Sequence, residues 1–367
     1  MVKFLHAADF HLDTPFRGLS PEQAIQRRRE QRELLETLTD LANRQNCDLM
    51  LLAGDLLDSD NAFPETVQAL VRALGAFRGQ VFIAPGNHDC LLSGSPYLSA
   101  PWPDNVHIFT QNKISSVTLP QLGCQVYGAG FTAMDAPALL EGFRVQDEDL
   151  LNLMVLHGDT ETAGSPYNPI SKEQISASGL DYLALGHIHK RKAPEKLGKT
   201  TFAWPGCILG RGFDECGEKG VYIGTLTDKE CKLEFHPLPG RRYEILTVAC
   251  KEDPLQDILR LLPADCTQDI YRIYLTGECD EPDLRSIYLS LEDKFYALHL
   301  KDKTTRKVNI WADAGEDSLR GQFLATLQEK LSAAATEEEQ QIILLAAELG
   351  LRAMEGREEL GLGSSGV

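Results

Sequence analysis

Residues 2–13 read VKFLHAADFHLD, an apolar run that ends in the carboxylate of Asp9 and the imidazole of His11. Such a run is typical of a buried strand, and both polar groups can bind a divalent metal. Four further segments place polar side chains after an apolar run in the same way: Gly54-Asp55-Leu56-Leu57-Asp58, Gly86-Asn87-His88-Asp89, His157-Gly158 and Gly186-His187-Ile188-His189. Since ligand sites of α/β folds lie at the carboxyl ends of strands, we expect all these segments to meet there.

Seven metal-binding donors are available in these segments, which is too many for one tetrahedral zinc ion and suits two ions. Mixed nitrogen and oxygen ligation with open positions favours Mn²⁺, with Fe²⁺, Co²⁺ or Zn²⁺ as possible substitutes. A carboxylate shared by both ions would let them polarise one phosphate together. We assign Asp9, His11 and His189 to the first ion, Asn87, His157 and His187 to the second, and Asp55 to both as the bridge.

Each segment alone has an ordinary structural explanation. An Asp after a strand is more often a turn or a helix cap, and two histidines around one apolar residue can occur at a surface strand end. All the segments in this order are hard to explain in that way. We expect Gly54, Gly86 and Gly186 to supply the bends, because glycine tolerates positive φ and close backbone approach. The other histidines are interpreted as structural or surface residues: His6, His107, His236 and His299.

The first ~235 residues alternate short apolar runs with longer amphipathic stretches, which predicts an α/β core. Between the first two runs, Ser20 is the expected N-cap of a helix that starts at Pro21, with Gln23 completing a capping box. The predicted strands are Val2–Ala7, Leu49–Ala53, Val81–Ala84, Gln125–Ala129, Leu153–Leu156 and Tyr182–Leu185.

A cluster of breakers at Pro237, Pro239 and Gly240 predicts that a first domain, residues 1–237, ends there. Residues 241–312 predict a small α+β domain, and residues 313–367 an acidic helical region with a capping box at Thr336 and Glu339. The elements expected in the α+β domain are strands Glu244–Ala249, Tyr271–Leu275, Phe295–Leu300 and Lys307–Trp311 and helices Pro254–Leu262 and Pro282–Leu291.

Composition limits the class of protein. The chain has 367 residues, 43% of them hydrophobic, which is enough for a sizeable core. It has no apolar stretch of membrane-spanning length and no signal-peptide pattern at its start, so we expect a cytoplasmic protein without membrane association. The nine cysteines form no C-x-x-C pair, which argues against a disulfide framework. The net charge of −18 argues against a uniformly basic surface for nucleic acid.

Taken together, the D-x-H, G-D-x-x-D, G-N-H-D, H-G and G-H-x-H segments resemble the signature of the calcineurin-like binuclear metallophosphoesterases. The resemblance covers residues 1 to about 235 and implies a four-layer αββα sandwich that holds two divalent ions. Within that family, the start His6–Asp13 and the form of Gly54–Asp58 are similar to SbcD-type DNA repair exonucleases. Those nuclease subunits work with an SbcC-type coiled-coil ATPase, and their capping domain corresponds in place to residues 241–312.

The subgroup resemblance implies a Mn²⁺-dependent 3′–5′ exonuclease and single-strand endonuclease that acts in DNA repair as a homodimer. His88 is not needed as a ligand, and its neighbour Asn87 would place it over the site. There it can stabilise the transition state or protonate the leaving 3′ oxygen. We expect Asp58 or Asp89 to orient His88 and raise its pKa, with helix capping as the alternative role of Asp89.

The acidity of the chain must be reconciled with a DNA substrate. Two divalent ions add a charge of +4 beside two ligand carboxylates, so the site itself attracts phosphate. Lys190, Arg191 and Lys192 are candidate contacts to the DNA backbone, or a solvated loop. Arg27–Arg29 and Arg32 are expected to face solvent or a subunit interface.

Two other functions stay open on the sequence alone. One is a phosphoesterase for a nucleotide or other small phosphodiester, which the acidity favours. The other is a non-catalytic scaffold, which the complete ligand set disfavours. The apolar stripe of Ile342, Leu345 and Leu349 is expected either to dock onto an ATPase coiled coil or to cover the capping domain.

Overall fold

The computed structural model describes residues 1–59, 62–162, 164–251, 253–279, 282–306 and 310–354, which form two compact units. The first unit contains residues 1–248, 258–274 and 284–301, and the second contains the described residues of 249–257, 275–283 and 302–367. None of the helices described is both long and apolar enough to cross a membrane. The predicted boundary near Gly240 stays a prediction.

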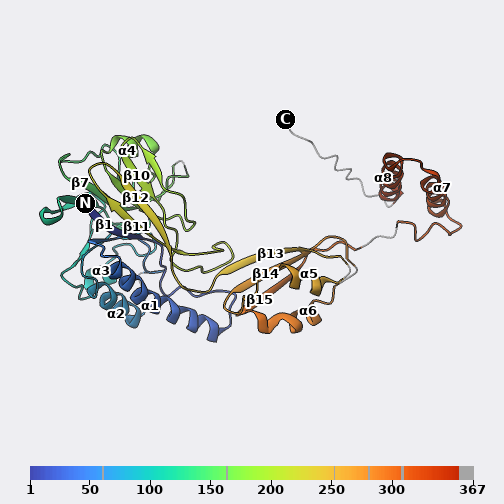
Figure 1. Cartoon of the computed structure of the whole chain (residues 1–367), viewed down its shortest axis with the longest axis horizontal. Helices are drawn as coiled ribbons and strands as arrows, with labels where there is room; N and C mark the ends of the chain where they lie inside the picture. The colour runs from blue at the N-terminus through green and yellow to red at the C-terminus, as the bar shows by residue number, and fades with distance from the viewer. Residues whose placement is uncertain (60–61, 163, 252, 280–281, 307–309, 355–367) are drawn as a thin grey trace. The chain divides into compact units, whose positions relative to one another are not determined.

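Two six-stranded sheets form the body of the first unit (Figure 1). The first sheet has the order β12 (Cys231–Pro237), β11 (Gly220–Leu226), β1 (Val2–Ala7), β2 (Leu49–Leu52), β3 (Gln80–Ile83) and β4 (Val106–Ile108). The second has the order β5 (Ser115–Leu119), β6 (Cys124–Gly128), β7 (Leu151–His157), β8 (Tyr182–Gly186), β10 (Thr200–Ala203) and β9 (Glu195–Leu197). Strands β1 to β4 run parallel to one another, as do β6, β7, β8 and β10. Their carboxyl ends therefore share one edge in each sheet.

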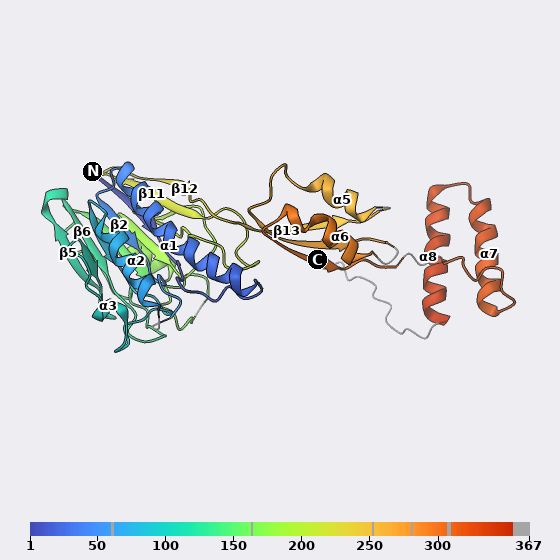
Figure 2. The same cartoon turned by 90° about the horizontal axis from the view of Figure 1, so that it is seen from below.

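Apolar side chains on both faces of the central strands explain the layering. One face of the first sheet packs with helices α1 (Pro21–Arg44) and α2 (Pro64–Gly75), and the second sheet packs with α4 (Lys172–Ala177). The facing sides of the sheets share a third core, in which Phe4 lies 4.5 Å from Tyr182 between ring centroids. Figure 2 shows helices α1 and α2 on the outer side of β2. The expected αββα sandwich is confirmed.

The N-terminus of α1 follows the predicted capping box. The Ser20 hydroxyl accepts from the backbone N–H of Gln23 at 3.2 Å, and the Gln23 side chain accepts from the backbone N–H of Ser20 at 3.1 Å. A single further turn of helix, α3 (Pro96–Ser99), precedes β4 and is capped by the Ser95 hydroxyl.

A smaller sheet has the order β13 (Tyr243–Ala249), β14 (Ile270–Thr276) and β15 (Ala297–Asp302), with helices α5 (Pro254–Leu261) and α6 (Leu284–Leu291) between its strands in the sequence. These elements match the strand and helix order predicted for the region up to residue 302. Of the predicted strand Lys307–Trp311, the first three residues lie outside the described residues, and Ile310 and Trp311 belong to a turn.

In the second unit, α7 (Leu319–Ala333) and α8 (Glu337–Met354) pack around Leu324, Ala347 and Leu351. Half of the predicted capping box is present, because Thr336 accepts from the backbone N–H of Glu339 at 3.2 Å. The Glu339 carboxylate instead accepts from the backbone N–H of Ala335. The predicted apolar stripe of α8 is exposed in the single chain: Ile342 by 60%, Leu345 by 55% and Leu349 by 38%.

Candidate metal centre

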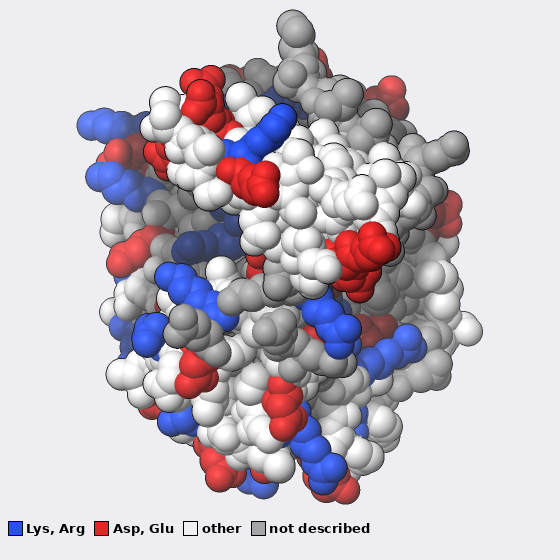
Figure 3. All heavy atoms as spheres, turned by 90° about the vertical axis from the view of Figure 1, so that its right-hand side faces the viewer, with Lys and Arg blue, Asp and Glu red and all other residues white. Residues whose placement is uncertain are grey.

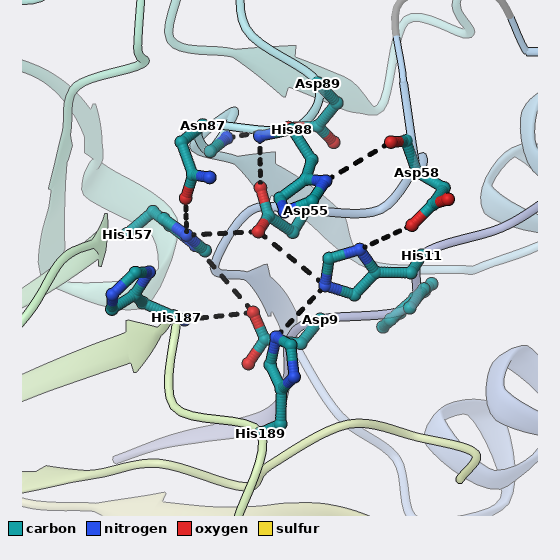
Figure 4. A network of polar contacts seen from close by, with 12 residues as sticks. Asp9, His11, Asp55, Asp58, Asn87, His88, Asp89, His157, His187 and His189 are labelled. Atoms are coloured by element: carbon teal, nitrogen blue, oxygen red, sulfur yellow. Dashed lines mark hydrogen bonds and ion pairs between the residues drawn. The ribbon is translucent and has the colours of Figure 1, made fainter. Parts of the chain in front are cut away.

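The polar segments that follow β1, β2, β3, β7 and β8 meet at the carboxyl edge of the two sheets (Figure 4). The first three strands belong to one sheet and the last two to the other. Each sheet therefore supplies part of the donor set, as expected for ligands at strand ends.

The first metal position consists of Asp9, His11, His189 and Asp55, whose ligand atoms all lie within 4.8 Å of one another. The Nε2 atoms of His11 and His189 are 3.2 Å apart. Two ligands that each lie ~2.0–2.1 Å from one metal would be separated by roughly 3.0–3.4 Å. Asp9 Oδ2 is buried and has no hydrogen-bond partner among the residues that the structure describes. A divalent cation would satisfy this oxygen, so the residues present fit a metal.

The four residues assigned to the second ion are Asn87, His157, His187 and, again, Asp55. His157 Nε2 lies 3.0 Å from Asn87 Oδ1 and 3.3 Å from Asp55 Oδ2. His157 Nδ1 lies 2.9 Å from the carbonyl oxygen of Ala53, so Nδ1–H donates there and Nε2 keeps its lone pair for a metal. The His187 ring lies beside that of His157, at 5.2 Å between centroids.

Asp55 lies between the two positions. Its Oδ2 is 3.7 Å from His11 Nε2 and 3.3 Å from His157 Nε2, while Oδ1 accepts from the backbone N–H of His88 at 2.9 Å. Burial opposes ionisation of Asp55, but the nearby imidazoles of His157 and His11 hold its pKa below its usual range. These distances fit the bridging role expected for Asp55.

The backbone turns sharply at the ligands themselves. Asp9, His11, Asp55 and His187 have φ values of 54°, 43°, 51° and 90°, in the left-handed region that non-glycine residues seldom adopt. Such residues cost on the order of 1–3 kcal/mol each and persist where the surrounding structure fixes them. Here the loops fix each other, because the backbone N–H of Asp9 donates to Gly54 and that of His11 to Asp55.

Of the three glycines predicted to supply the bends, only Gly54 has positive φ, at 80°. The other two are required by close approach. A Cβ on Gly86 would lie 2.3 Å from Asp55 Oδ1, and one on Gly186 would lie 1.9 Å from the carbonyl oxygen of Ala53. The prediction is therefore corrected: of the three glycines only Gly54 has the left-handed conformation, and after Gly186 the ligand His187 has it instead.

Two carboxylates orient the histidines of the first metal position. Asp58 Oδ1 lies 3.1 Å from His11 Nδ1, and Glu215 Oε1 lies 2.8 Å from His189 Nδ1. In both cases Nε2 faces the donor cluster. Burial would raise the pKa values of both carboxyl groups, but His11 next to Asp58 and His189 with Arg211 next to Glu215 hold them below the usual range.

His88 lies outside the buried cluster of Asp9, His11, Asp55 and His189, and it forms a second group of possible donors with His11 and Asp58, whose ligand atoms lie within 4.8 Å of one another. Its side chain is exposed, and its ring lies 4.7 Å from that of His11 between centroids (Figure 4). Asp58 contacts it through the main-chain carbonyl, 3.3 Å from His88 Nδ1. The Asp58 carboxylate points to His11, so the expectation that it orients His88 is corrected.

Asp89 takes neither of the roles expected from the sequence. Its carboxylate accepts hydrogen bonds from the backbone N–H groups of Gly86, Leu56 and Leu57 and from the Tyr97 hydroxyl, the last at 2.5 Å. These donors use its acceptor positions, and no helix begins at Asp89. The buried Asp89 carboxylate therefore links the loop after β2, which contains Asp55, to its own loop after β3. Burial and the nearby Asp55 raise its pKa.

The basic residues after His189 are partly engaged elsewhere. The Arg191 guanidinium lies 3.9 Å over the Phe235 ring, and Lys192 is ion-paired with Glu161. Lys190 is exposed. On the face in Figure 3, the described Lys and Arg side chains are interspersed with Asp and Glu.

The basic side chains of α1 differ in exposure, and not all of them face solvent as expected. Arg27 is fully buried, pairs with Glu30 and donates to the carbonyl oxygen of Gly210 at 3.0 Å. Arg32 contacts Thr66 at 3.4 Å, whereas Arg29 is strongly exposed and pairs with Glu33. The prediction that this group faces solvent or a subunit interface is corrected for Arg27.

Three residues that support the ligands carry no motif in the sequence. Gln31 donates from α1 to the carbonyl oxygens of Phe10 and His11, at 3.2 and 3.0 Å. Arg211 and Glu215 lie in the loop after β10, far in the sequence from the histidine that they contact. Glycines in that loop indicate a turn, but no spacing pattern links the loop to His189.

Comparisons with known proteins find metallophosphoesterases. A model of the family described as calcineurin-like phosphoesterase matches residues 2–191, more than half of the chain. A protein of Bacillus subtilis (strain 168) that bears the name uncharacterized metallophosphoesterase YhaO is 32% identical over 246 residues. The match covers 64% of this chain and 60% of that protein, so the chain spans less than two thirds of its relative.

Two solved structures are also similar. TT1561 of Thermus thermophilus has 14% identity and a TM-score of 0.40, and the match covers 64% of this chain and 98% of that one. A dimetal phosphatase from Danio rerio has 12% identity and a TM-score of 0.43, with coverage of 65% and 96%. The match of the family model over residues 2–191, together with the donor cluster, shows that this chain belongs to the calcineurin-like phosphoesterases, a family of metal-dependent phosphoester hydrolases.

Proposed function

We propose that this protein hydrolyses DNA phosphodiester bonds, as a 3′–5′ exonuclease and single-strand endonuclease in DNA repair. The observation that carries the proposal is the exposed His88 ring beside a buried donor cluster, since a phosphodiester needs both a cation pair and a proton donor for its leaving oxygen. The forms of residues 6–13 and 54–58, which are similar to those of SbcD-type nucleases, support DNA as the substrate.

The residues around the site have distinct roles in this proposal. Two divalent ions, which we propose to be Mn²⁺, supply positive charge to the phosphate when bound and lower the pKa of water. The ligands of the two metal positions hold them, and Asp58 fixes the His11 ring. His88 donates a proton to the leaving 3′ oxygen, with its Nδ1 directed to the carbonyl oxygen of Asp58.

The acidity of the chain suggests that it does not hold DNA alone. The net charge is −18, and two of the three basic residues after His189 already contact Phe235 and Glu161. We therefore propose a cytoplasmic homodimer that works with an SbcC-like coiled-coil ATPase. The exposed apolar stripe of α8 supports a partner for the second unit, since apolar helix faces seek burial.

One comparison of substrates tests the proposal. Mn²⁺-dependent release of nucleotides from labelled DNA is measured at low salt, beside hydrolysis of cyclic nucleotides and bis-p-nitrophenyl phosphate. We expect cleavage of DNA, with activity that falls steeply as salt rises. If DNA stays intact while the small esters are hydrolysed, the DNA proposal is wrong and the small-substrate alternative is right.

The His88→Ala variant tests the assigned proton donor. We expect it to keep both metals and to lose about 10²- to 10⁴-fold in kcat. His107→Ala, at an exposed histidine of β4, is the matched control and should keep its kcat. An unchanged kcat in His88→Ala would remove His88 from the reaction.

The acidity favours a second candidate, a phosphoesterase for a nucleotide or other small phosphodiester. Such a substrate needs no extended basic surface, and two of the three basic residues after His189 already contact Phe235 and Glu161. The same substrate comparison separates the two candidates.

A further inference from the structure

We propose that Glu215 is a positioning residue that fixes His189 as an Nε2 donor and thereby sets the affinity of the first metal position. The inference rests on the metal centre that the family implies, and not on DNA as the substrate. Glu215 belongs to neither group of possible metal donors among the described residues, and it faces the Nδ1 side of the His189 ring.

The geometry places the Glu215 carboxylate where it acts on His189 and Arg211. Its side chain is 3% exposed, and Oε1 lies 2.8 Å from His189 Nδ1. The Arg211 guanidinium forms an ion pair with the same carboxylate, and Oε2 accepts from the backbone N–H of Arg211 at 2.8 Å. A buried carboxylate with these partners is held in one orientation.

Two tautomers of His189 compete at this point. Arg211 Nη2 also lies 2.8 Å from His189 Nδ1, and a guanidinium can only donate. If Arg211 donates to Nδ1, the ring proton is on Nε2 and points toward the first metal position. If Nδ1–H donates to Glu215, Nε2 presents its lone pair there. The negative charge of Glu215 favours the second tautomer, which is the one that a metal requires.

Contacts within the protein hold the Glu215 loop in place. Phe213, two residues earlier, packs between the rings of Tyr243 and His299, at 5.1 and 5.3 Å, and under the Arg272 guanidinium at 3.9 Å. At the start of the loop, the Gly210 carbonyl accepts a hydrogen bond from α1 at 3.0 Å. The fold itself therefore positions the carboxylate beside His189.

Asp58 does the same for His11, and Arg211 lies between the two carboxylates. Its Nη1 is 3.6 Å from Asp58 Oδ1, while its Nε is within 3.2 Å of both Glu215 oxygens. The positive charge of Arg211 thus offsets the repulsion between the Asp58 and Glu215 carboxylates. The first metal position is consequently sensitive to Glu215, while the second, whose His157 is fixed by a main-chain carbonyl, is not.

Glu215→Gln tests the proposal, because glutamine keeps the shape of the side chain and removes its charge. Titration of the full-length chain with Mn²⁺ by calorimetry should show one of two sites weakened by about 10- to 100-fold and the other unchanged. Glu218→Gln is the matched control, since Glu218 is half exposed and pairs only loosely, at 3.6 Å, with Arg242. The control should bind both ions like the parent.

A second measurement needs no variant at the positioning residue. Long-range ¹H–¹⁵N NMR of the metal-free parent, with the His189 signal assigned from the spectrum of His189→Gln, reports which ring nitrogen carries the proton. We expect the proton on Nδ1 in the parent. A proton on Nε2, or unchanged affinity of both sites in a folded Glu215→Gln chain, would overturn the proposal. Neither result depends on whether DNA is cleaved.

Discussion

The interior between the two sheets and the edge where the ligands meet each contain a buried histidine, and the two differ sharply. His6 lies between the sheets, with Nδ1 at 2.7 Å from the Tyr182 hydroxyl and Nε2 at 3.2 Å from the Leu185 carbonyl oxygen. Burial lowers its pKa to about 3. At the edge, burial also opposes a charge on His157, but the carboxylates of Asp55 and Asp9 raise its pKa to about 9.

The difference shows what distinguishes a structural histidine from a ligand in this fold. Both rings are fully buried, so burial alone does not separate them. The ring nitrogens of His6 face neutral hydrogen-bond partners, so the ring stays uncharged. His157 lies beside carboxylates whose negative charge attracts a cation. In the metal-free chain a proton supplies that charge, and divalent ions would displace it.

The largest expected effect comes from removing the shared carboxylate. Asp55→Asn should reduce hydrolysis of bis-p-nitrophenyl phosphate by about 10³-fold or more, because both metal positions lose a ligand. In the metal-free variant, the pKa of His157 should fall from about 9 toward that of a buried neutral histidine such as His6. Both are measurable, by kinetics and by NMR titration.

Asp104→Asn, at an exposed position before β4, is the matched control and should change neither quantity. If His157 kept its high pKa in Asp55→Asn, the contrast between the two histidines would need another cause.

Metal removal should destabilise the edge and leave the interior unchanged. At an ion concentration 100 times the dissociation constant, a bound ion stabilises the folded chain by about 2.7 kcal/mol, so a chelator should lower Tm. The NMR signals of His6 should stay in place while those of His157 move. A Tm that does not respond to chelator would show that neither position is filled under those conditions.

Asp58→Asn should weaken the first metal position by about 10- to 100-fold, because His11 loses the carboxylate that orients it. The second position should keep its affinity, since a main-chain carbonyl fixes His157. Calorimetric titration with Mn²⁺ measures both. Equal weakening of the two positions would mean that the ions are bound as one unit.

The smallest effect, counted per pH unit, is on acid stability, and it separates the two histidines by pH. The folded-state pKa of His6 is depressed to about 3, so below pH 6.5 only the unfolded chain takes up a proton at this residue. Stability should therefore fall by up to about 1.4 kcal/mol per pH unit as pH drops from 6.5. Because the pKa of His157 is raised, its contribution is complete below pH 6.5 and is lost as pH rises through about 9.

Urea unfolding of the metal-free chain between pH 5 and 6.5, compared with His6→Gln, measures the contribution of His6. The parent should show the steeper dependence on pH. Equal slopes in the two proteins would show that His6 is protonated in the folded state.

The sequence predicts the parts of the molecule that carry a local signal. The strands that precede ligands are mostly apolar runs, and the predicted bounds of β1 are those observed, because a strand buried on both faces has few polar positions. The predicted donors also meet at the strand ends. By contrast, β12 alternates partly buried and exposed residues around Lys232 and Glu234, and β4 and β9 have only three residues each. None of these three strands forms a continuous apolar run in the sequence.

The supporting contacts escape prediction because they depend on three-dimensional proximity. Asp58 lies three residues after Asp55 but orients His11, and Asp89 follows His88 but binds backbone amides of the Asp55 loop. Sequence neighbours suggest the wrong partners in both cases. Glu215 lies 2.8 Å from His189 in space and has no sequence pattern that joins them.

The division of the ligands between two sheets has a consequence for the order of folding. The first metal position combines Asp9 and His11 with His189, and the second combines Asn87 with His157 and His187, so neither can be completed by one sheet alone. During synthesis, the N-terminal donors can bind an ion together with His189 only after the segment around residue 189 has been made and the second sheet has packed against the first. Ion binding would then come late in folding and stabilise a sandwich that has already formed. It would not act as a folding nucleus.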